Sequence, residues 1–283
     1  MQILRSYHSH SRKHLGKMPK GKVIALLTDF GLDDNYVGTM KAVIAGINPK
    51  ACVIDLSHAV QPQDILGGAF LLNASYKFFP KGTIFVVVVD PGVGGERKIV
   101  CVQTRDYIFL SPDNGILGPV TAQEEILSLV EVSNTKFFLP NVSSTFHGRD
   151  IFAPVAAHLS LGLKPARLGD NLEELKKIDL PRPKVSTGGT LTGEIIYVDR
   201  FGNLITNIDD NLIKGAGANI SSITIGDKKI GKLITSYQDG HSGEPVALIG
   251  SPGHLEVAVN CGNASKSLNC SRGDKVTVKF VRS

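Results

Sequence analysis

The sequence lacks the long apolar run that a membrane-spanning helix needs. Such a helix takes about 20 predominantly apolar residues, whereas the run "IFVVVV" at positions 84–89 is short and β-branched and predicts a buried strand. The first 22 residues also lack the apolar core of a secretory signal. The four cysteines form no C-x-x-C pair and no zinc-type spacing; they are Cys52, Cys101, Cys261 and Cys270. We therefore expect buried, reduced thiols in a cytoplasmic protein.

An excess of positive charge is also missing from most of the chain. The formal net charge is +5, but residues 1–22 hold six basic residues and no acidic one, which leaves 25 basic and 26 acidic residues elsewhere. A nucleic-acid-binding protein carries its positive charge on a face of the fold, so we expect no nucleic-acid partner. We expect residues 1–21 to be a disordered extension, or an over-long start with Met18 as the initiator. An organelle-targeting leader is the alternative.

The glycine-rich stretch "FVVVVDPGVGGERK" (85–98) lacks the pattern of a phosphate-binding loop. It matches neither G-x-x-x-x-G-K-[ST] nor G-x-G-x-x-G, and the acid before the glycines would repel a phosphate. A tight turn explains Asp90-Pro91-Gly92, but a turn does not require Gly94 and Gly95 as well. Removing so many side chains allows a ligand or another chain to approach the backbone.

The chain has two parts with different sequence patterns. From residue 22 to about 180, apolar strands (23–28, 52–57 and 83–90) alternate with amphipathic helices (36–47 and 64–79), which predicts a mostly parallel sheet covered on both faces. Residues 180–190 are rich in Pro, Ser and Gly and predict a linker. Residues 190–283 contain only short, often alternating β-like pieces. We therefore predict a basic extension (1–21), a three-layer α/β domain (22–180) and a smaller antiparallel β-barrel or sandwich (190–283).

Ligands of such sheets bind beyond the carboxyl ends of the strands, where Asp29, Ser57 and Asp90 are expected. Asp33 and Asp34 follow Asp29; the three acids suit a hard cation, or the last two cap the next helix. Asp29 ends the first strand too early to cap a helix, and its carboxylate suits the two hydroxyls of a ribose.

The stretch "TFHGRDIFAPVAAHL" (145–159) supplies a further candidate, His147, in a loop beside Gly148. We interpret Asp150 as a helix N-cap and treat His58 and His158 as structural. "SPDNGIL" (111–117) predicts an Asn-Gly turn.

In the second part, "VDRFGNLITNI" places Asp199, Phe201 and Asn203 in and around one turn, and Ser251 precedes another strand. Each of these pieces alone is explained by a turn. Together they supply an aromatic face, a carboxylate and an amide, which suit a nucleoside or an amino acid.

Seven motifs occur in a fixed order: "TDFGxxDxYVGxMK", "DxSHxVxPxD", "VxVVDPGVGxxRK", "PDNGxL", "TFHGRDxFAPVAAHL", "DxFGNLxTNI" and "VNxGNAS". In this series, which covers roughly residues 22–281, the sequence resembles the S-adenosyl-L-methionine (SAM) hydroxide adenosyltransferases. These are also called SAM hydrolases (adenosine-forming) and are relatives of the fluorinase and chlorinase.

The resemblance implies an α/β N-terminal domain, a β-barrel C-terminal domain and homotrimers whose active sites lie between subunits. It implies a catalytic triad of Asp90, Arg97 and His147 that positions a water. Our hypothesis is that Arg97 lowers the pKa of this water, that His147 accepts or relays its proton, and that Asp90 holds Arg97 in place. Asp29 would hold the ribose, Asp199 and Ser251 the methionine end, and Phe201 and Asn203 the adenine. Asp33 and Tyr237 complete the expected substrate-binding residues. SAM is then a substrate, and no cofactor or metal is expected.

The expected reaction is hydrolysis of SAM to adenosine and L-methionine. The fluorinase and chlorinase use a dry halide pocket, with an aromatic or small residue at the triad positions and an insertion near residue 104 that this chain lacks. The three charged or ionisable groups of this chain suit hydroxide better than a desolvated halide, so we do not expect halogenation. Halide-dependent cleavage is kept as one alternative, and a non-catalytic adenosine- or SAM-binding module is another. A metal-dependent hydrolase using Asp29, Asp33 and Asp34 would be inhibited by chelators, which we do not expect.

Overall fold

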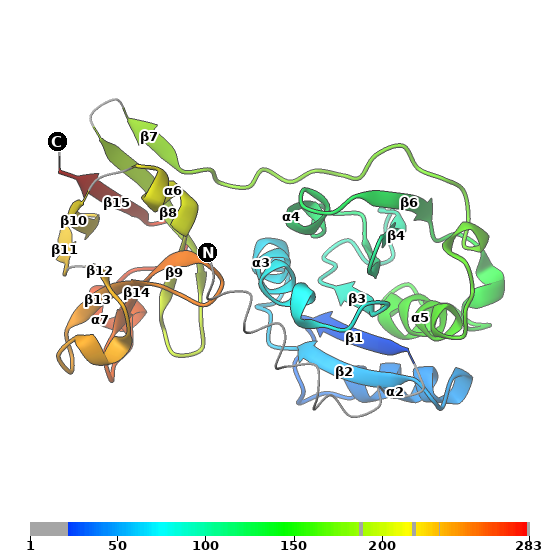
Figure 1. Ribbon diagram of the computed structural model, residues 1–283. Coiled ribbons are helices and arrows are strands. Elements are labelled where there is room, and N and C mark those ends of the chain that lie inside the picture. The colour runs from blue at the N-terminus through cyan, green and yellow to red at the C-terminus, as the bar shows by residue number, and fades with distance from the viewer. Residues whose placement is uncertain (1–21, 187–188, 217–218, 232, 282–283) are drawn as a thin grey trace, which may run out of the picture. The chain divides into compact units, whose positions relative to one another are not determined.

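The computed structural model describes residues 22–186, 189–216, 219–231 and 233–281 (Figure 1). The chain divides into two compact units, the first ending at Ile178 and the second beginning at Asp179. The expectation for the basic extension, residues 1–21, lies outside the described residues. Within the part that is described, no helix is long and apolar enough to cross a bilayer.

A six-stranded sheet forms the centre of the first unit. Its spatial order is β2 (Cys52–Ser57), β1 (Val23–Thr28), β3 (Ile84–Val88), β5 (Ile108–Pro112), β4 (Ile99–Thr104) and β6 (Ile126–Glu131). The pairs β2–β1, β1–β3 and β3–β5 are parallel, whereas β4 runs antiparallel to both β5 and β6. The sheet is thus mostly parallel, as predicted, with one reversed strand.

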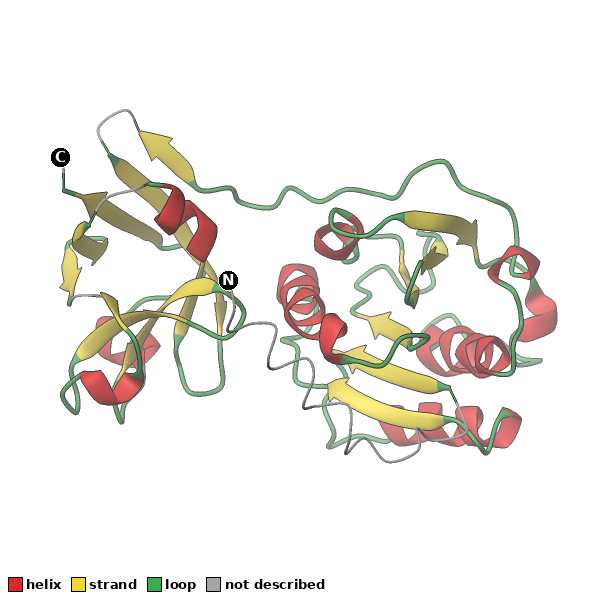
Figure 2. Ribbon diagram, viewed as in Figure 1, coloured by secondary structure: helices red, strands yellow, loops and turns green. Residues whose placement is uncertain are grey.

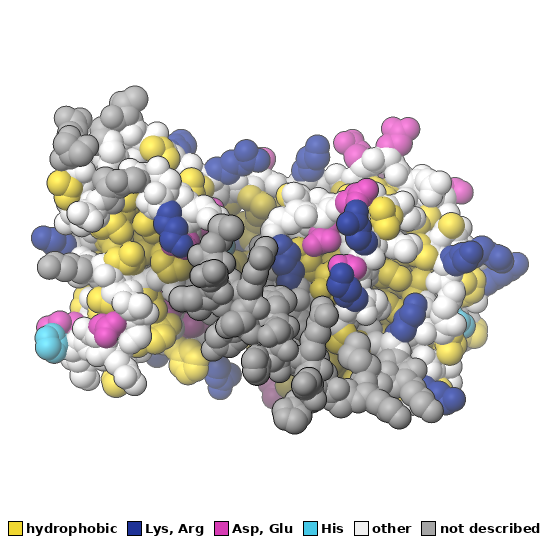
Figure 3. All heavy atoms as spheres, in the orientation of Figure 1, with side chains coloured by type: hydrophobic (Ala, Val, Ile, Leu, Met, Phe, Trp, Pro, Cys, Tyr) yellow, Lys and Arg dark blue, Asp and Glu magenta, His cyan; other side chains and the backbone are white. Residues whose placement is uncertain are grey.

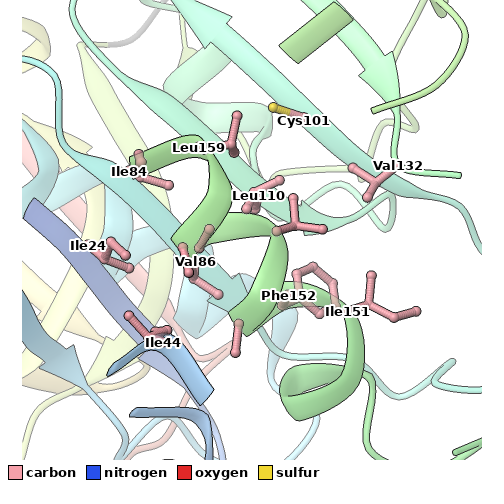
Figure 4. Close-up of a cluster of buried hydrophobic side chains, with 14 of the residues drawn as sticks. Ile24, Ile44, Ile84, Val86, Cys101, Leu110, Val132, Ile151, Phe152 and Leu159 are labelled. Carbon is pink, nitrogen blue, oxygen red and sulfur yellow. The ribbon is translucent and has the colours of Figure 1, made fainter. Parts of the chain in front are cut away.

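Helices cover both faces of this sheet (Figure 2). One face carries α2 (Tyr36–Ile47) and α5 (Ala153–Ser160); the other carries α3 (Ile65–Ser75) and the short α4 (Gly118–Thr121). Alternation along β1 separates the two cores, because Ile24 and Leu26 pack on the α2–α5 side and Ala25 and Leu27 on the α3–α4 side. Figure 4 shows the first of these cores, where Phe152 and Leu159 lie over the strands. The predicted three-layer α/β architecture is confirmed.

Single turns of 3-10 helix complete the unit. They are η2 (Tyr76–Phe78), η3 (Thr135–Phe137) and η5 (Pro165–Arg167). A five-residue π-helix, η4 (Gly148–Phe152), leads directly into α5.

The second unit is a curled, mostly antiparallel sheet. Its spatial order is β11 (Lys228–Ile230), β10 (Ile220–Ile225), β15 (Lys275–Phe280), β8 (Thr190–Val198), β9 (Leu204–Asp209), β14 (His254–Val259), β13 (Pro245–Ile249) and β12 (Leu233–Ile234), with β7 (Lys184–Ser186) paired to β8. The pair β12–β13 is the parallel exception. Burial alternates along the first part of β8, where Leu191 and Ile195 point into the core. Two short helices, α6 (Asp210–Gly215) and α7 (Ala264–Leu268), and the 3-10 turn η6 (Tyr237–Asp239) flank the sheet.

Basic side chains lie apart from one another on the face shown in Figure 3, where Lys and Arg side chains are scattered among acidic and apolar ones. Cys101 and Cys270 are buried and Cys52 is partly buried, but Cys261 is exposed, so the expectation of buried thiols is wrong for Cys261. Cys261 lies in the turn after β14, outside the strands of the sheet.

Candidate active site

Two loops of the first unit lie at one edge of its sheet, the loop after β1 and the loop between β3 and β4. Asp29 directly follows β1, and Asp90 lies two residues after β3. Arg97 lies two residues before β4. Because β4 runs opposite to β3 and β5, its amino end lies at the same edge as their carboxyl ends. The reversed strand therefore brings Arg97 back toward Asp90.

Asp90, Arg97 and His147 form one connected group. Arg97 Nε donates to Asp90 Oδ1 at 3.1 Å and to Oδ2 at 2.9 Å, and Nη2 donates to Oδ2 at 2.6 Å. The same Nη2 lies 2.7 Å from His147 Nδ1. The side chains of Arg97 and Asp90 are only 12% and 4% exposed, so this charged pair is well shielded from water. The sequence prediction that these three residues come together is confirmed.

The contact with Arg97 fixes the protonation of the His147 ring. An arginine guanidinium only donates hydrogen bonds and keeps its charge in proteins, so Nδ1 accepts, and the neutral ring carries its proton on Nε2. Burial and the Arg97 charge lower the pKa of His147 below its usual value of 6.5, although Asp90, Asp150 and the Ser143 backbone oppose this. His147 is therefore held in its neutral form.

His147 precedes the π-helix η4, a feature frequent at functional sites. Asp150 lies inside this helix rather than at its start, so the interpretation of Asp150 as an N-cap is wrong. Its carboxylate accepts the Ser143 backbone N–H at 2.8 Å, seven residues upstream. It also accepts from Arg149 Nε at 2.6 Å. These contacts anchor the irregular segment that ends at His147.

The glycine-rich loop that follows Asp90 packs against the segment that ends at His147. Gly94 has a φ of 76°, and a Cβ added there would lie 2.1 Å from the Ser144 carbonyl oxygen. What approaches the backbone at this glycine is thus another loop of the same unit.

A pocket of about 380 Å³ opens beside the group, within the usual range for small-molecule sites. Asp29, Asp90 and His147 are among the residues that line it, whereas Arg97 is not, so Arg97 lies behind the two side chains it contacts. Asp29 Oδ2 accepts the Gln63 backbone N–H at 2.8 Å. The pocket lining thus contains two carboxylates, and the Arg97 guanidinium contacts one of them from outside the lining.

Part of the pocket lining is aromatic, which was not predicted from the sequence. Phe30, Tyr36 and Phe146 line the pocket, with ring centroids 5.0–5.9 Å apart. These rings lie in the two stretches "TDFGLDDNY" and "TFHGRD", beside the candidate polar residues. Their position beside candidate polar residues was the available signal.

Asp33 and Asp34 are exposed and are not among the residues lining this pocket. Neither acid caps the next helix, because α2 begins after Asn35 without a side-chain cap bond, and the capping interpretation is wrong. Across the described ranges, no cluster of three or more His, Cys, Asp or Glu is placed to hold a metal ion.

Two other residues near this edge have structural contacts. His58 is buried, and its Nδ1 lies 2.8 Å from Thr28 Oγ1, as befits the structural role expected for it. Asn114 does more than form a turn, because its Nδ2 donates to the Val89 carbonyl at 2.8 Å, directly before Asp90.

The second unit holds the remaining candidates. Asp199 Oδ1 accepts the backbone N–H groups of Phe201 and Asn203 at 2.9 and 2.8 Å, and Oδ2 accepts Asn203 Nδ2 at 2.9 Å. Phe201 is 74% exposed, and Ser251 is exposed as well. The predicted turn is confirmed, and it presents an aromatic ring outward from a carboxylate-anchored base.

Glu256 was missed by the sequence reasoning. It is 5% exposed and accepts a 2.5 Å hydrogen bond from the Tyr237 hydroxyl. Burial and the nearby Asp199 raise the pKa of Glu256, although the Tyr237 contact lowers it. A Cβ on Gly250 would lie 2.5 Å from Glu256 Oε2, so the backbone before Ser251 rests on this carboxyl. In the sequence, Glu256 is one polar residue within an otherwise β-like stretch, and this pattern does not indicate a function.

Comparison with known proteins agrees with this arrangement. Residues 24–169 match the SAM hydroxide adenosyltransferase N-terminal domain and residues 193–277 the C-terminal domain. The chain is 38% identical over 259 residues to a Thermus thermophilus protein named (R)-S-adenosyl-L-methionine hydrolase, covering 88% of this chain and 96% of that protein. It is 34% identical over 269 residues to a Methanocaldococcus jannaschii protein of the same name, covering 91% and 96%.

A fluorinase of Actinoplanes sp. is 28% identical over 291 residues, covering 90% of this chain and 97% of that protein. The crystal structure of an uncharacterized protein from Thermotoga maritima matches with a TM-score of 0.85 at 39% identity, covering 90% of this chain and 99% of that one. From the matched domains and relatives, the chain belongs to the SAM hydroxide adenosyltransferase family.

Proposed function

We propose that this protein is an enzyme that hydrolyses SAM to adenosine and L-methionine. The observation that carries the proposal is the linked Asp90–Arg97–His147 group, whose Asp90 and His147 line a pocket together with Asp29. The names of relatives at 34–38% identity support the same substrate.

Each part of SAM can be assigned to residues whose side chains suit its chemistry. Asp29 would bind the ribose hydroxyls, because its carboxylate lines the pocket and Gln63 occupies only one of its oxygens. Asp199 and Ser251 would bind the amino-acid end. Phe201 and Asn203 would frame the adenine. Asp33 and Tyr237 are proposed as further contacts, Tyr237 through its pairing with Glu256.

The bond changes are simple. A water oxygen forms a bond to C5′ while the C5′–S bond breaks, and the electron pair returns to sulfur as a neutral thioether. The water loses one proton, so the products are adenosine, methionine and a proton. Because the sulfonium is already a good leaving group, the obstacle is the weak nucleophile. Positioning can contribute about 7–11 kcal/mol in favourable cases.

The geometry supports a division of work that differs from the one expected from the sequence. A carboxylate offers about four lone-pair sites, and Arg97 uses one on Asp90 Oδ1 and two on Oδ2. Oδ1 therefore keeps a site for a water proton, and we assign Asp90 the acceptor role. His147 cannot accept a proton at Nε2 while Nδ1 accepts from Arg97, so it holds Arg97 in place.

We further propose a cytoplasmic homotrimer whose active sites combine the first unit of one subunit with the second unit of its neighbour. This rests on the family resemblance. SAM is a substrate in this proposal, and no cofactor takes part.

The direct test is turnover. Purified protein is incubated with SAM in chloride-free buffer containing EDTA, and adenosine and methionine are followed by chromatography beside Asp90→Asn. Equal amounts of both products, lost in the variant, are expected. Binding of SAM without any product would refute the proposal in favour of a binding module. A 5′-halogenated nucleoside that forms only when halide is added would refute it in favour of halide-dependent cleavage.

A further inference from the structure

The position of His147 depends on a segment without regular secondary structure. Between η3, which ends at Phe137, and the π-helix η4, which begins at Gly148, the chain forms neither helix nor strand ahead of His147. His147 Nδ1 must nevertheless reach Arg97 Nη2 at 2.7 Å. Something outside the local backbone pattern has to fix this segment.

Asp150 makes the contacts that do so. Its carboxylate is 1% exposed and accepts the Ser143 backbone N–H at 2.8 Å. Its own backbone carbonyl accepts the Leu139 N–H at 2.9 Å. One buried residue thus ties down two points of the segment that leads to His147.

Arg149 neutralises the buried charge of Asp150 and adds a contact with Phe146. Its Nε and Nη2 donate to Asp150 Oδ1 and Oδ2 at 2.6 and 3.1 Å. Its guanidinium carbon lies 5.2 Å from the centre of the Phe146 ring, within cation–π range. Phe146 is the residue before His147 and also lines the pocket.

We propose that Asp150 is a positioning residue for the reaction, holding His147 on Arg97 through its contacts with Ser143 and Arg149. This inference rests on the proposed function for its kinetic consequence, and on the contacts alone for its structural one. A shift of about 1 Å in a reacting group can lower a rate about 100-fold.

The charge on Asp150 gives a readout that a merely structural role would not move. The groups that face His147 are Arg97 and Asp90 from the β3–β4 loop and Asp150 from η4; Asp29 and Tyr36 line the same pocket. Burial and Arg97 lower the pKa of His147, whereas Asp90 and Asp150 raise it. Asp150→Asn keeps an oxygen for the Ser143 N–H and removes the charge, so the pKa of His147 should fall further.

The test compares three variants. Asp150→Asn is the main one. Arg149→Gln changes a side chain that is 35% exposed and leaves the Asp150 charge in place. Asn48→Ala removes a buried 2.7 Å hydrogen bond from Nδ2 to Ser160 Oγ, at the far end of α5, and serves as the control for lost stability. The histidine ring of His147 is titrated by NMR, its signal being assigned by its loss in His147→Asn, and kcat is measured by adenosine formation.

In Asp150→Asn, we expect the His147 titration to move to lower pH and kcat to fall about 10- to 100-fold. In Arg149→Gln, kcat should fall several-fold without a downward shift of the titration. Asn48→Ala should change neither. An unshifted titration with wild-type kcat in Asp150→Asn would overturn the proposal. If Asp150→Asn does not fold, wild-type kcat in Arg149→Gln would overturn it. Absence of turnover in the wild-type protein would instead refute the proposed function, because the NMR titration needs no turnover.

Discussion

The role of His147 can be tested by substituting it with two residues that differ in a single property. His147→Ala removes the ring and leaves Arg97 Nη2 without its acceptor at 2.7 Å. His147→Asn restores an oxygen that can accept from Nη2 but provides no group that takes up a proton near neutral pH. The pair therefore separates an acceptor that holds Arg97 from a general base.

The expected losses follow from the burial of Arg97. Its side chain is 12% exposed, so water only partly replaces the lost partner. A hydrogen bond to a charged group contributes about 1.5–3 kcal/mol, which corresponds to a rate loss of about 10- to 150-fold if all of it is used in the transition state. We expect His147→Ala to fall in this range and His147→Asn to stay within about 10-fold of the wild-type enzyme.

The assay is kcat/KM for adenosine formation between about pH 5 and pH 9. Protonation of His147 would place an N–H against Arg97, so the wild-type rate should fall on the acidic side, below the lowered pKa of His147. His147→Asn should lose this acidic limb, while its rate at higher pH stays within about 10-fold of the wild-type rate. Equal losses of about 100- to 10,000-fold in Asn and Ala variants would show that His147 is a general base and would refute this reasoning.

Two other substitutions test close packing in the first unit and the buried carboxyl of the second. Gly94→Ala places a Cβ 2.1 Å from the Ser144 carbonyl, so it should lower kcat more than Gly82→Ala, which shares the positive φ but has open space; equal rates in circular-dichroism-matched samples would contradict the packing argument. Glu256→Gln keeps an acceptor for Tyr237 and removes a carboxyl whose pKa is raised above 4.5. The stability that neutral Glu256 confers is lost as pH rises through its folded pKa, so the variant should have the higher Tm near pH 8 but not at acidic pH; a lower Tm at pH 8 would show that the argument is wrong.

Much of the α/β unit could be predicted from the sequence, because its central strands β1 and β3 are buried at every position. The strand at 84–88 and the helix at 36–47 follow directly from apolar runs and from helical spacing. The reversal of β4 could not be read in this way, because a buried antiparallel strand has the same apolar pattern as a parallel one. Yet this reversal is what brings Arg97 to Asp90.

The site was predictable as a set of residues but not as an arrangement. Asp90, Arg97 and His147 were expected together, but the position of Arg97 behind the other two depends on side-chain directions. Asp150 was misassigned because an acid before an apolar helix usually caps it. Here the chain first forms a π-helix, and the carboxylate turns back to Ser143.

The charges around the pocket bear on the choice of nucleophile. Asp29 and Asp90 line it, Arg97 neutralises one of these charges from behind, and the pKa of His147 is lowered so that the ring stays neutral. The pocket thus has a net negative charge, which attracts a cationic sulfonium. A halide about 4 Å from the Asp90 carboxylate would be repelled by about 4 kcal/mol at an effective dielectric constant of 20, and Arg97 offsets only part of this, since it lies farther from the pocket. A neutral water meets no such repulsion and can donate a proton to the same carboxylate, so the residue that excludes a halide is also the one that favours water.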